Sequence, residues 1–391
     1  MIPSVSSRYG GPVAALKAMA SGLAAEGVSV VVATTDADSG AARLDVPVGT
    51  PVTSDAVYYH FKRTAQLYNV SLGLLGWLRK HVAEFDVVHI HALFTWSSTV
   101  AAFEAKRQRV PYVVRPLGVL NQWGMTQRRP LAKRLSFGAV ESRILRGSAC
   151  IHYTSDAERN EAALLGAAVR DHRSVVIPVP VQTLAAGDAA LLQEKFPILR
   201  GGKVILFLSR LHPKKGIELL LDAFALVRKR HPDAVLLIAG DGDAACVESL
   251  RARRSAVEQG AQIVWAGHID GALKASAFAT ASMFVLPSAS ENFGVAAAES
   301  LGAGIPTIVS PDVAISAEIA AARAGIVVER ETKKIAQAIN DVLASAVDLQ
   351  TLVANGRQLV NERYSTTAVG RALVQLYRGV VSPVANRQSE R

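Results

Sequence analysis

The chain has 391 residues, of which 50% are hydrophobic and 19% are charged, a composition that predicts two globular domains and excludes a disordered or low-complexity protein. Its two cysteines, Cys150 and Cys246, lie far apart in the sequence, which excludes a disulfide framework and a cysteine-based zinc site and favours a reducing cytoplasm. The formal net charge of +10 indicates an anionic partner, but no aromatic residues interleave with the basic clusters, so we expect no nucleic acid.

No apolar run approaches the roughly 18 residues that a membrane-spanning helix needs. The opening sequence, MIPSVSSRYGGP, has neither the basic start nor the apolar stretch of a signal peptide. We therefore expect a soluble protein, or one that binds a membrane only at its surface.

Short β-branched runs alternate with amphipathic helical stretches from residue 28 onward, a pattern typical of parallel sheets covered on both faces. Only MIPSV precedes the first glycine-rich loop, so we expect a very short opening strand. In the first half of the chain the sequence predicts further strands at 28–34, 56–61, 86–91, 111–115, 149–153 and 175–177.

Pro178 and Pro180 interrupt this pattern, and a fresh alternation begins at Lys203, which predicts a linker between two domains. We expect the tail from Ser382 to lack regular structure because it has no apolar periodicity. The predicted fold class is α/β, with two Rossmann-like doubly wound domains at 1–180 and 181–365 and a last segment, 366–391, whose helix returns to the first domain. The second domain should contain strands at 204–209, 234–239, 262–266, 282–286 and 307–310, and helices at 216–230, 244–259 and 294–303.

A cationic loop follows the first strand of the second domain. In SRLHPKKG, Arg210 stands at the strand end and Lys215 directly precedes a helix that Gly216 opens. Ligands of doubly wound sheets bind beyond the carboxyl ends of the strands, and a diphosphate is a common anion at a strand-to-helix corner. The loop therefore predicts a diphosphate site, with a solvated basic turn as the alternative.

Two acids lie near the end of the same domain, in SASENFGVAAAESLGAGIP. Glu291 and Glu299 are separated by seven residues, and a helix start at Gly294 places the first in the loop and the second just over one turn inside the helix. Both can then face one site. The amides from Phe293 to Val295 would lie at a helix N-terminus, where a phosphate or sugar oxygen can be held. An ordinary helix surface is the alternative.

Together, these residues resemble the retaining family-4 (group 1) glycosyltransferases of GT-B fold, in which two domains face each other across a cleft. The resemblance includes IAGDGD at 238–243 and WAGHI at 265–269 and covers almost the whole chain. In the first domain, Gly10 and Gly11 match the double glycine that faces the donor across the cleft in that family. The stretch at 115–134 resembles a subgroup active in bacterial surface polysaccharide assembly.

The resemblance implies a retaining, metal-independent hexosyltransferase that uses a nucleotide-diphosphate sugar, such as a UDP- or GDP-sugar, and no other cofactor. Its acceptor would be a saccharide or a polyprenyl-diphosphate-linked saccharide. Arg210 and Lys215 would bind the diphosphate and Glu291 the transferred sugar, as the catalytic set. Fixed cations would stabilise the charge that develops on the leaving diphosphate, with no covalent glutamate nucleophile. The donor-binding set implied is Gly10, Gly11, Asn292, Phe293, Gly294, Val295 and Glu299, the last on the nucleotide ribose.

One departure from the family concerns the first domain. Many relatives carry a histidine in the loop after the fifth strand, and here Leu117 occupies that position. His91 and Arg115 then become the alternative acceptor-side groups, although a core imidazole is an equally good interpretation of His91. Two alternatives stay open. One is a nucleotide-sugar epimerase of the same fold, and the other, because of this departure and the short opening strand, is a catalytically silent nucleotide-sugar-binding protein.

Three other motifs have simpler explanations. The DxD tripeptides at 36–38 and 241–243 resemble a metal site of another glycosyltransferase fold, but a cationic phosphate site makes a metal redundant, so we expect none. The degenerate fingerprint at 240–245 lacks the acid that a dinucleotide site needs at the next strand end. Ser155 and Glu158 have capping-box spacing, and a helix start explains them.

A basic cluster in the first domain faces one acid, Glu141. Each cation contributes about 1 kcal/mol near an anionic leaflet, so the cluster could hold the protein at the inner face of the cytoplasmic membrane, where a lipid-linked acceptor would reside. A solvated basic face is the alternative. The cations are Arg128, Arg129, Lys133, Arg134, Arg143 and Arg146.

Overall fold

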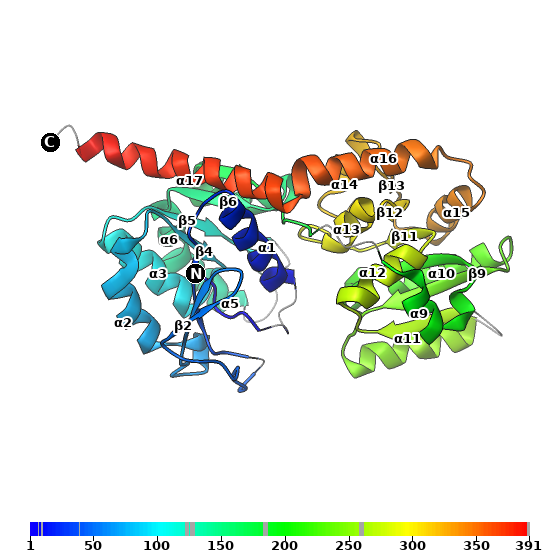
Figure 1. Ribbon diagram of the computed structural model, residues 1–391, viewed down its shortest axis with the longest axis horizontal. Helices are drawn as coiled ribbons and strands as arrows, with labels where there is room; N and C mark the ends of the chain where they lie inside the picture. Colours follow the sequence, from blue (N-terminus) through cyan, green and yellow to red (C-terminus); the bar gives the residue numbers. More distant parts are fainter. Residues whose placement is uncertain are drawn as a thin grey trace. The chain divides into compact units, whose positions relative to one another are not determined.

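The computed structural model describes the chain with the exception of residues 7, 9–10, 39, 122–124, 126–129, 183–186, 258–261 and 389–391. The chain divides into two compact units, which are shown in Figure 1. Unit 1 combines Met1–Pro180 with Thr366–Arg391, and unit 2 is Val181–Ser365. No helix among the described residues is both long and apolar enough to cross a membrane.

Unit 1 contains two groups of strands. In the first, β1 (Val31–Thr35) pairs in parallel with β3 (Val57–Phe61), which also pairs antiparallel with the short β2 (Pro51–Thr53). The second is a parallel sheet in chain order, and its strands are β4 (Val88–His91), β5 (Tyr112–Arg115), β6 (Cys150–Tyr153) and β7 (Ser174–Val176).

The first residues of the chain join these two sheets. The Ile2 amide donates to the Ala33 carbonyl (3.3 Å), and the His91 amide donates to the Met1 carbonyl (2.8 Å). Ser4 forms a parallel bridge with Thr35 and is the last paired residue of the segment. The opening segment therefore lies between β1 and β4, where a doubly wound sheet has its first strand, and it is as short as predicted.

The helices of unit 1 include two that are far apart in the sequence and lie side by side, α1 (Gly11–Ala25) and α17 (Thr366–Gln388) (Figure 1). A Cβ atom on Gly22 would lie 2.5 Å from the Thr366 carbonyl oxygen, so only glycine permits this close crossing. The other α-helices are α2 (Leu72–His81), α3 (Trp96–Arg107), α5 (Pro130–Ser136), α6 (Ser142–Gly147), α7 (Asp156–Ala163) and α8 (Ala167–Arg170).

The prediction of an irregular tail from Ser382 was wrong, because α17 continues as a helix to Gln388. Its earlier turns bury Val369, Leu373 and Leu376 against Met19 of α1 in one apolar cluster. Once a helix is anchored in this way, each further residue gains a backbone hydrogen bond without a new nucleation cost, so weak local patterning does not end it.

Unit 2 is built on one parallel sheet with the order β10-β9-β8-β11-β12-β13. Numbered from β8, this order is 3-2-1-4-5-6, and it reverses direction between β8 and β11. The crevice at the carboxyl ends of those two strands is the usual ligand position. The strands are β8 (Lys203–Leu208), β9 (Ala234–Ala239), β10 (Ile263–Gly267), β11 (Met283–Leu286), β12 (Thr307–Val309) and β13 (Ile326–Val327).

Helices cover this sheet and pack against one another in pairs: α10 against α15, α12 against α9, and α13 against α16. In α10 the apolar face buries Leu220, Leu221 and Phe224, at the spacing of an amphipathic helix. The helices are α9 (Ala189–Lys195), α10 (Ile217–Arg228), α11 (Ala244–Val257), α12 (Gly271–Thr280), α13 (Val295–Ala303), α14 (Ser316–Ala321), α15 (Thr332–Leu343) and α16 (Leu349–Leu359).

Candidate active site

Two loops of unit 2 are tied together where the sheet order reverses. The loop after β8 ends at Gly216, which has φ +72°, and a Cβ there would lie 2.1 Å from the Pro287 carbonyl oxygen in the loop after β11. The Ala289 amide donates to the Lys214 carbonyl (2.6 Å), and the Ser288 hydroxyl donates to the same oxygen (3.1 Å). Glycine at 216 thus lets the β8 and β11 loops share one corner.

Lys215 and Glu291 meet across this corner. The Lys215 ammonium donates to a carboxylate oxygen of Glu291, and the two side chains are only 12% and 14% exposed. The Glu291 amide donates to the Asp312 carbonyl (3.1 Å), which fixes the loop against the segment after β12. The structure therefore brings together two of the predicted catalytic residues, 76 positions apart.

The corner carries more positive than negative charge. Arg210 is exposed at the end of β8 and forms no ion pair with any residue that the structure describes. Burial, followed by the charge of Lys215, lowers the pKa of Lys214, and burial followed by the neighbouring lysines lowers the pKa of His212. Burial is the main cause of both shifts, and repulsion between the neighbouring cations adds to it, so an anionic ligand at this corner would be favoured.

The start of α13 lies beside Glu291. Gly294 precedes the helix with φ +98°, and Val295 is its first residue. Asn292 is exposed, but the side chain of Phe293 is buried, with its ring edge-on to Tyr364 at 5.3 Å between centroids. Phe293 can therefore offer a ligand only its backbone amide.

Glu299 pairs with a residue that the sequence analysis did not identify. The Lys274 ammonium donates to Glu299 Oε1 (2.6 Å), and the side chains are 23% and 11% exposed. Lys274 lies on α12 and Glu299 on α13, so this ion pair links two helices. The sequence offered one signal for Lys274: it is the single charged residue in GALKASAFAT, a stretch of mostly small and apolar residues.

The predicted acceptor-side residues of unit 1 lie in its core. His91 and Arg115 end β4 and β5 in register with each other, and they are 3% and 1% exposed. A guanidinium nitrogen of Arg115 lies 3.2 Å from Met19 Sδ, and Arg115 Nε and His91 Nδ1 have no hydrogen-bond partner among the residues that the structure describes. Gly11 begins α1 with open space where a Cβ would point, while Gly10 lies outside the described residues.

Buried imidazoles surround these two residues. His152 Nε2 donates to the Ile177 carbonyl (2.8 Å), so His152 Nδ1 accepts from His89 Nε2 (3.2 Å) and His89 Nδ1 accepts from the Tyr377 hydroxyl (2.8 Å). Burial, with the positive charge of Arg115, lowers the pKa of His152 to about 3 and that of His89 and His91 well below the usual value. The network is neutral and connects β4 and β6 to α17.

The loop that carries Leu117 is held by a buried acid. Leu117 has φ +60°, and the Gly118 amide donates to Glu158 Oε1 (2.6 Å). Ser155 caps α7 by accepting from the Glu158 amide (3.1 Å), as the capping-box interpretation predicts. The Glu158 carboxylate, however, accepts from the Thr154 amide (2.7 Å) and from this loop. A helix start alone was therefore an incomplete explanation for Glu158.

The two DxD tripeptides have structural partners. Asp36 accepts from the Arg63 amide (2.7 Å), and Asp38 accepts from the Ser6 hydroxyl (2.5 Å). Asp243 accepts from the Cys246 amide (2.9 Å) at the start of α11. Among the described residues, no group of three or more His, Cys, Asp or Glu side chains is arranged to hold a metal ion.

The glycine fingerprint at 240–245 also has a packing role. Gly240 has φ +134°, and a Cβ there would lie 1.9 Å from the Ser209 carbonyl oxygen. The Leu211 amide donates to the Asp241 carbonyl (2.8 Å), so the loops after β8 and β9 run in contact. Gly240 therefore accommodates a neighbouring backbone, a packing role that needs no ligand.

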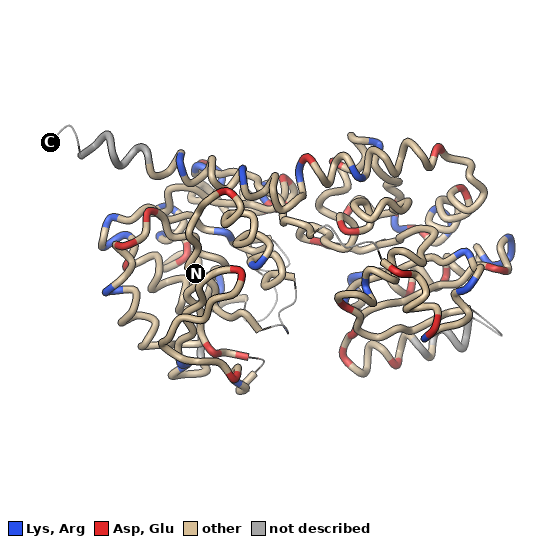
Figure 2. The backbone as a smooth tube through the Cα atoms, in the orientation of Figure 1, with Lys and Arg blue, Asp and Glu red and all other residues tan. Residues whose placement is uncertain are grey.

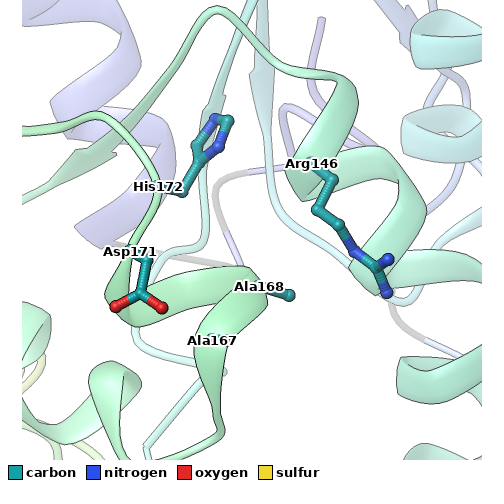
Figure 3. Close-up of a pocket in the computed structure, with 5 residues that line it drawn as sticks. All are labelled: Arg146, Ala167, Ala168, Asp171 and His172. Carbon is teal, nitrogen blue, oxygen red and sulfur yellow. The ribbon is translucent and has the colours of Figure 1, made fainter.

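A surface pocket of unit 1 lies elsewhere (Figure 3). Asp171 and His172 line it just before β7 begins, so they lie at the amino-terminal edge of the sheet, opposite the edge where ligands of such sheets bind. None of the predicted site residues lines it. The complete lining is Arg146, Ala167, Ala168, Asp171 and His172.

Comparison with known families identifies both halves of the chain. The family described as glycosyl transferases group 1 matches residues 189–359, and the glycosyl transferase 4-like domain matches residues 10–180. The chain is a family-4, group 1 glycosyltransferase. The family predicted from Arg210, Lys215 and the E-x7-E block is therefore confirmed.

Two relatives of this glycosyltransferase have names that mention inositol. Phosphatidyl-myo-inositol mannosyltransferase of Mycobacterium tuberculosis is 32% identical over 222 residues, which are 55% of this chain and 56% of the relative. D-inositol 3-phosphate glycosyltransferase of Frankia alni is 25% identical over 313 residues, 77% of this chain and 76% of the relative. The chain thus spans about half the length of the mannosyltransferases that it matches.

Solved structures establish the fold of the glycosyltransferase as GT-B, as predicted. Sucrose-phosphate synthase from Thermosynechococcus elongatus aligns with a TM-score of 0.75 at 21% identity, over 96% of this chain and 94% of that one. Anabaena HepE in complex with UDP and glucose aligns with a TM-score of 0.74 at 17% identity, over 97% and 98%.

Proposed function

We propose that the protein transfers a hexosyl group, with retention of configuration, from a nucleotide-diphosphate sugar to a saccharide or lipid-linked saccharide. The observation that carries this proposal is the corner of unit 2 in which Lys215 and Glu291 form a nearly buried ion pair where the sheet order reverses. Arg210 adds a cation, and the start of α13 adds backbone amides that have no acceptor within the helix. A diphosphate joined to a sugar matches this combination of charges and hydrogen-bond donors.

The roles follow from the chemistry of a glycosyl phosphate. The bond from the anomeric carbon to the phosphate oxygen breaks, and negative charge grows on the phosphate, where Arg210 and Lys215 stabilise it without a metal. The acceptor oxygen bonds to the anomeric carbon on the same face, and its proton passes to the departing phosphate. Glu291 accepts hydrogen bonds from the sugar hydroxyls, and Glu299 accepts them from the ribose.

A nucleotide-sugar donor is further supported by HepE, a structural neighbour whose solved complexes contain UDP-glucose or UDP and glucose. For the acceptor, the name of the mannosyltransferase relatives includes a phospholipid. We propose a lipid-linked saccharide of cell-surface polysaccharide synthesis, used at the inner face of the cytoplasmic membrane. Lys133 and Arg134 of α5 lie in the described part of the proposed membrane surface, while Arg128 and Arg129 lie outside the described residues.

The proposal is tested first by ligand binding. A nucleotide sugar that binds the native state raises the melting temperature by mass action, so a thermal-shift screen of UDP-, GDP- and ADP-sugars should identify the donor. Donor hydrolysis or transfer is then measured for the wild type and for Lys215→Ala and Glu291→Ala. Each variant should lose about 10²- to 10³-fold in turnover, the range found when one charge-stabilising contact is removed.

The control variant is Lys334→Ala, which removes an exposed Lys–Glu pair of the same unit, 2.9 Å from Glu331. It should leave turnover unchanged. Donor binding without turnover in the wild type would favour the silent binding protein, and release of a stereoisomeric nucleotide sugar without acceptor would favour the epimerase.

A further inference from the structure

The segment at 130–147 of unit 1 is helical throughout, but only its second half is packed. It comprises α5, a π-helical turn (Phe137–Glu141) and α6. Ile144 and Leu145 of α6 are buried, and Phe137 and Val140 pack against the same apolar core. None of the residues of α5 is buried. The two turns of α5 are therefore not packed into the core, whereas α6, which follows them, is.

The outward turns carry two large apolar side chains. Leu131 and Leu135 are 74% and 75% exposed, and a spacing of four residues places them on one face of the helix. A single exposed leucine is ordinary on a protein surface, but two neighbours on one helical face form a hydrophobic patch. Such a patch is stabilised when an apolar phase covers it.

The same segment is positively charged at its surface. The charged residues of both units are coloured in Figure 2, and helices such as α3 and α10 carry both acidic and basic residues. In 130–147 the only acid is Glu141, which is 2% exposed and accepts from the Ser136 hydroxyl (2.7 Å). The cations are Lys133 and Arg134 on α5 and the exposed Arg143 and Arg146 on α6. No exposed acid of this segment offsets them.

We propose that α5 lies in the headgroup region of an anionic membrane, with Leu131 and Leu135 inserted among the acyl chains and the flanking cations at the level of the lipid phosphates. An apolar helical face bordered by Lys and Arg, with no exposed acid, has the chemistry of an interfacial helix. An anionic bilayer can bind both groups of residues: its acyl chains cover the leucines, and its phosphates pair with the cations. This inference rests on the proposed membrane location, and it adds that the leucines, as well as the charges, hold the protein there.

Two turns of helix give reversible binding. Each cation near an anionic surface contributes about fivefold in partitioning, the equivalent of about 1 kcal/mol. Each inserted leucine contributes about tenfold or more, from the apolar area that it buries. Salt should therefore weaken the binding without abolishing the contribution of the leucines, because screening acts on charges and not on apolar burial.

The test is co-sedimentation of the full chain with vesicles of phosphatidylglycerol and phosphatidylcholine in equal parts. The variants are Leu131→Ser with Leu135→Ser, and Lys133→Gln with Arg134→Gln. We expect about a 100-fold loss of partitioning for the leucine pair and about a 25-fold loss for the cation pair, the products of the single-residue factors. Leu164→Ser is the matched control, because Leu164 is 82% exposed in the same unit but lies outside this segment. It should bind like the wild type.

Insertion is measured separately by Leu135→Trp, whose emission should shift to the blue and be quenched by brominated lipid. Unchanged partitioning of the leucine pair, or an unshifted tryptophan, would overturn the inference, as would a leucine-dependent dimer without vesicles. Because these side chains are exposed, the variants should keep the wild-type melting temperature, which checks their folding. Nucleotide-sugar turnover without vesicles tests the proposed glycosyl transfer independently of the membrane. Failure of the insertion hypothesis can therefore be distinguished from failure of the proposed function.

Discussion

Lys215 has an anionic partner within the protein itself, Glu291. In the proposed mechanism the diphosphate takes the ammonium, and the carboxylate is released toward the sugar hydroxyls. Glu291 therefore competes with a bare nucleoside diphosphate for Lys215 but assists a nucleotide sugar. These two roles of Glu291 can be measured separately, the first with a nucleoside diphosphate and the second with a nucleotide sugar.

Glu291→Gln should bind UDP or GDP at least as tightly as the wild type, because the competing negative charge is gone. Its transfer activity should fall by about 10²-fold or more, because a neutral amide supports the sugar cation less well. Calorimetric titration with the diphosphate, beside turnover with the donor, checks both. Weaker binding of the diphosphate would contradict the competition.

Lys274 holds one oxygen of Glu299 and leaves the other to accept from a ligand. Lys274→Met should therefore reduce the preference for a nucleoside diphosphate over its 2′- and 3′-deoxy forms, with affinity for the deoxy forms little changed. The expected reduction is about tenfold, the value of one charge-assisted hydrogen bond. Lys334→Met, in the exposed pair with Glu331, is the control and should keep the preference.

At this scale the sequence predicted that Lys215 and Glu291 lie at one corner, and the structure joins them in an ion pair; the roles of Lys215, Glu291 and Glu299 toward a donor stay predictions. The partner of Glu299 could not be found in this way. Lys274 lies 25 positions away on another helix, and only the packing of α12 beside α13 brings it near. A core position was one of the two interpretations of His91 that the sequence left open, and its burial favours that one. Burial of Arg115 could not be predicted, because it depends on the packing of α1, whose Met19 contacts the guanidinium group.

At the scale of elements, the loops of unit 2 are positioned by glycines that approach a neighbouring backbone. Gly240→Ala should destabilise unit 2 by about 3 kcal/mol or more, because the new methyl group overlaps the Ser209 carbonyl oxygen and the residue keeps φ +134°. Gly271→Ala is the control: φ is +47° with open space at the Cβ position, so about 1 kcal/mol of strain is expected. Urea unfolding of both variants measures the difference, and equal losses would contradict the overlap.

Most strands could be predicted because buried parallel strands are rich in β-branched and aliphatic residues, as in AVLLIA of β9, whose predicted bounds match the structure. The edge strands β2 and β13 were missed. They have three and two residues, too few to show a period, and they form only by pairing with β3 and β12. Tertiary pairing, which the local sequence does not encode, decides such short strands.

At the scale of the whole molecule, the neutral network of His89, His152 and Tyr377 makes the stability of unit 1 depend on pH. The pKa of His152 is lowered to about 3 in the folded state, against about 6.5 when unfolded. Its contribution is complete above pH 6.5 and is lost as the pH falls toward 3. His89 and His91 are shifted in the same direction, and burial lowers the pKa of the Met1 amine to about 5.

Lowering the pH from 6.5 to 5 should therefore cost unit 1 about 2 kcal/mol through His152, with a further loss in the same direction from His89 and His91. Unfolding by urea across this range checks the prediction through its dependence on pH. His152→Gln keeps a side chain of similar polarity but cannot be protonated. Its free energy of unfolding should therefore depend less on pH, by the equivalent of one proton taken up on unfolding. A stability that does not change between pH 6.5 and 5 would show that these histidines are not neutral in the native state.

The packing of α17 on α1 makes unit 2 an insertion within unit 1, since the chain leaves the first unit after Pro180 and re-enters it at Thr366. During synthesis, the unit that starts first is consequently the last to be completed. Met19, Leu23 and Cys150 have no α17 to cover them until the ribosome has made the other unit. A nascent chain stopped at residue 365 should bind chaperones through this uncovered surface, and translation of the last helix should release them.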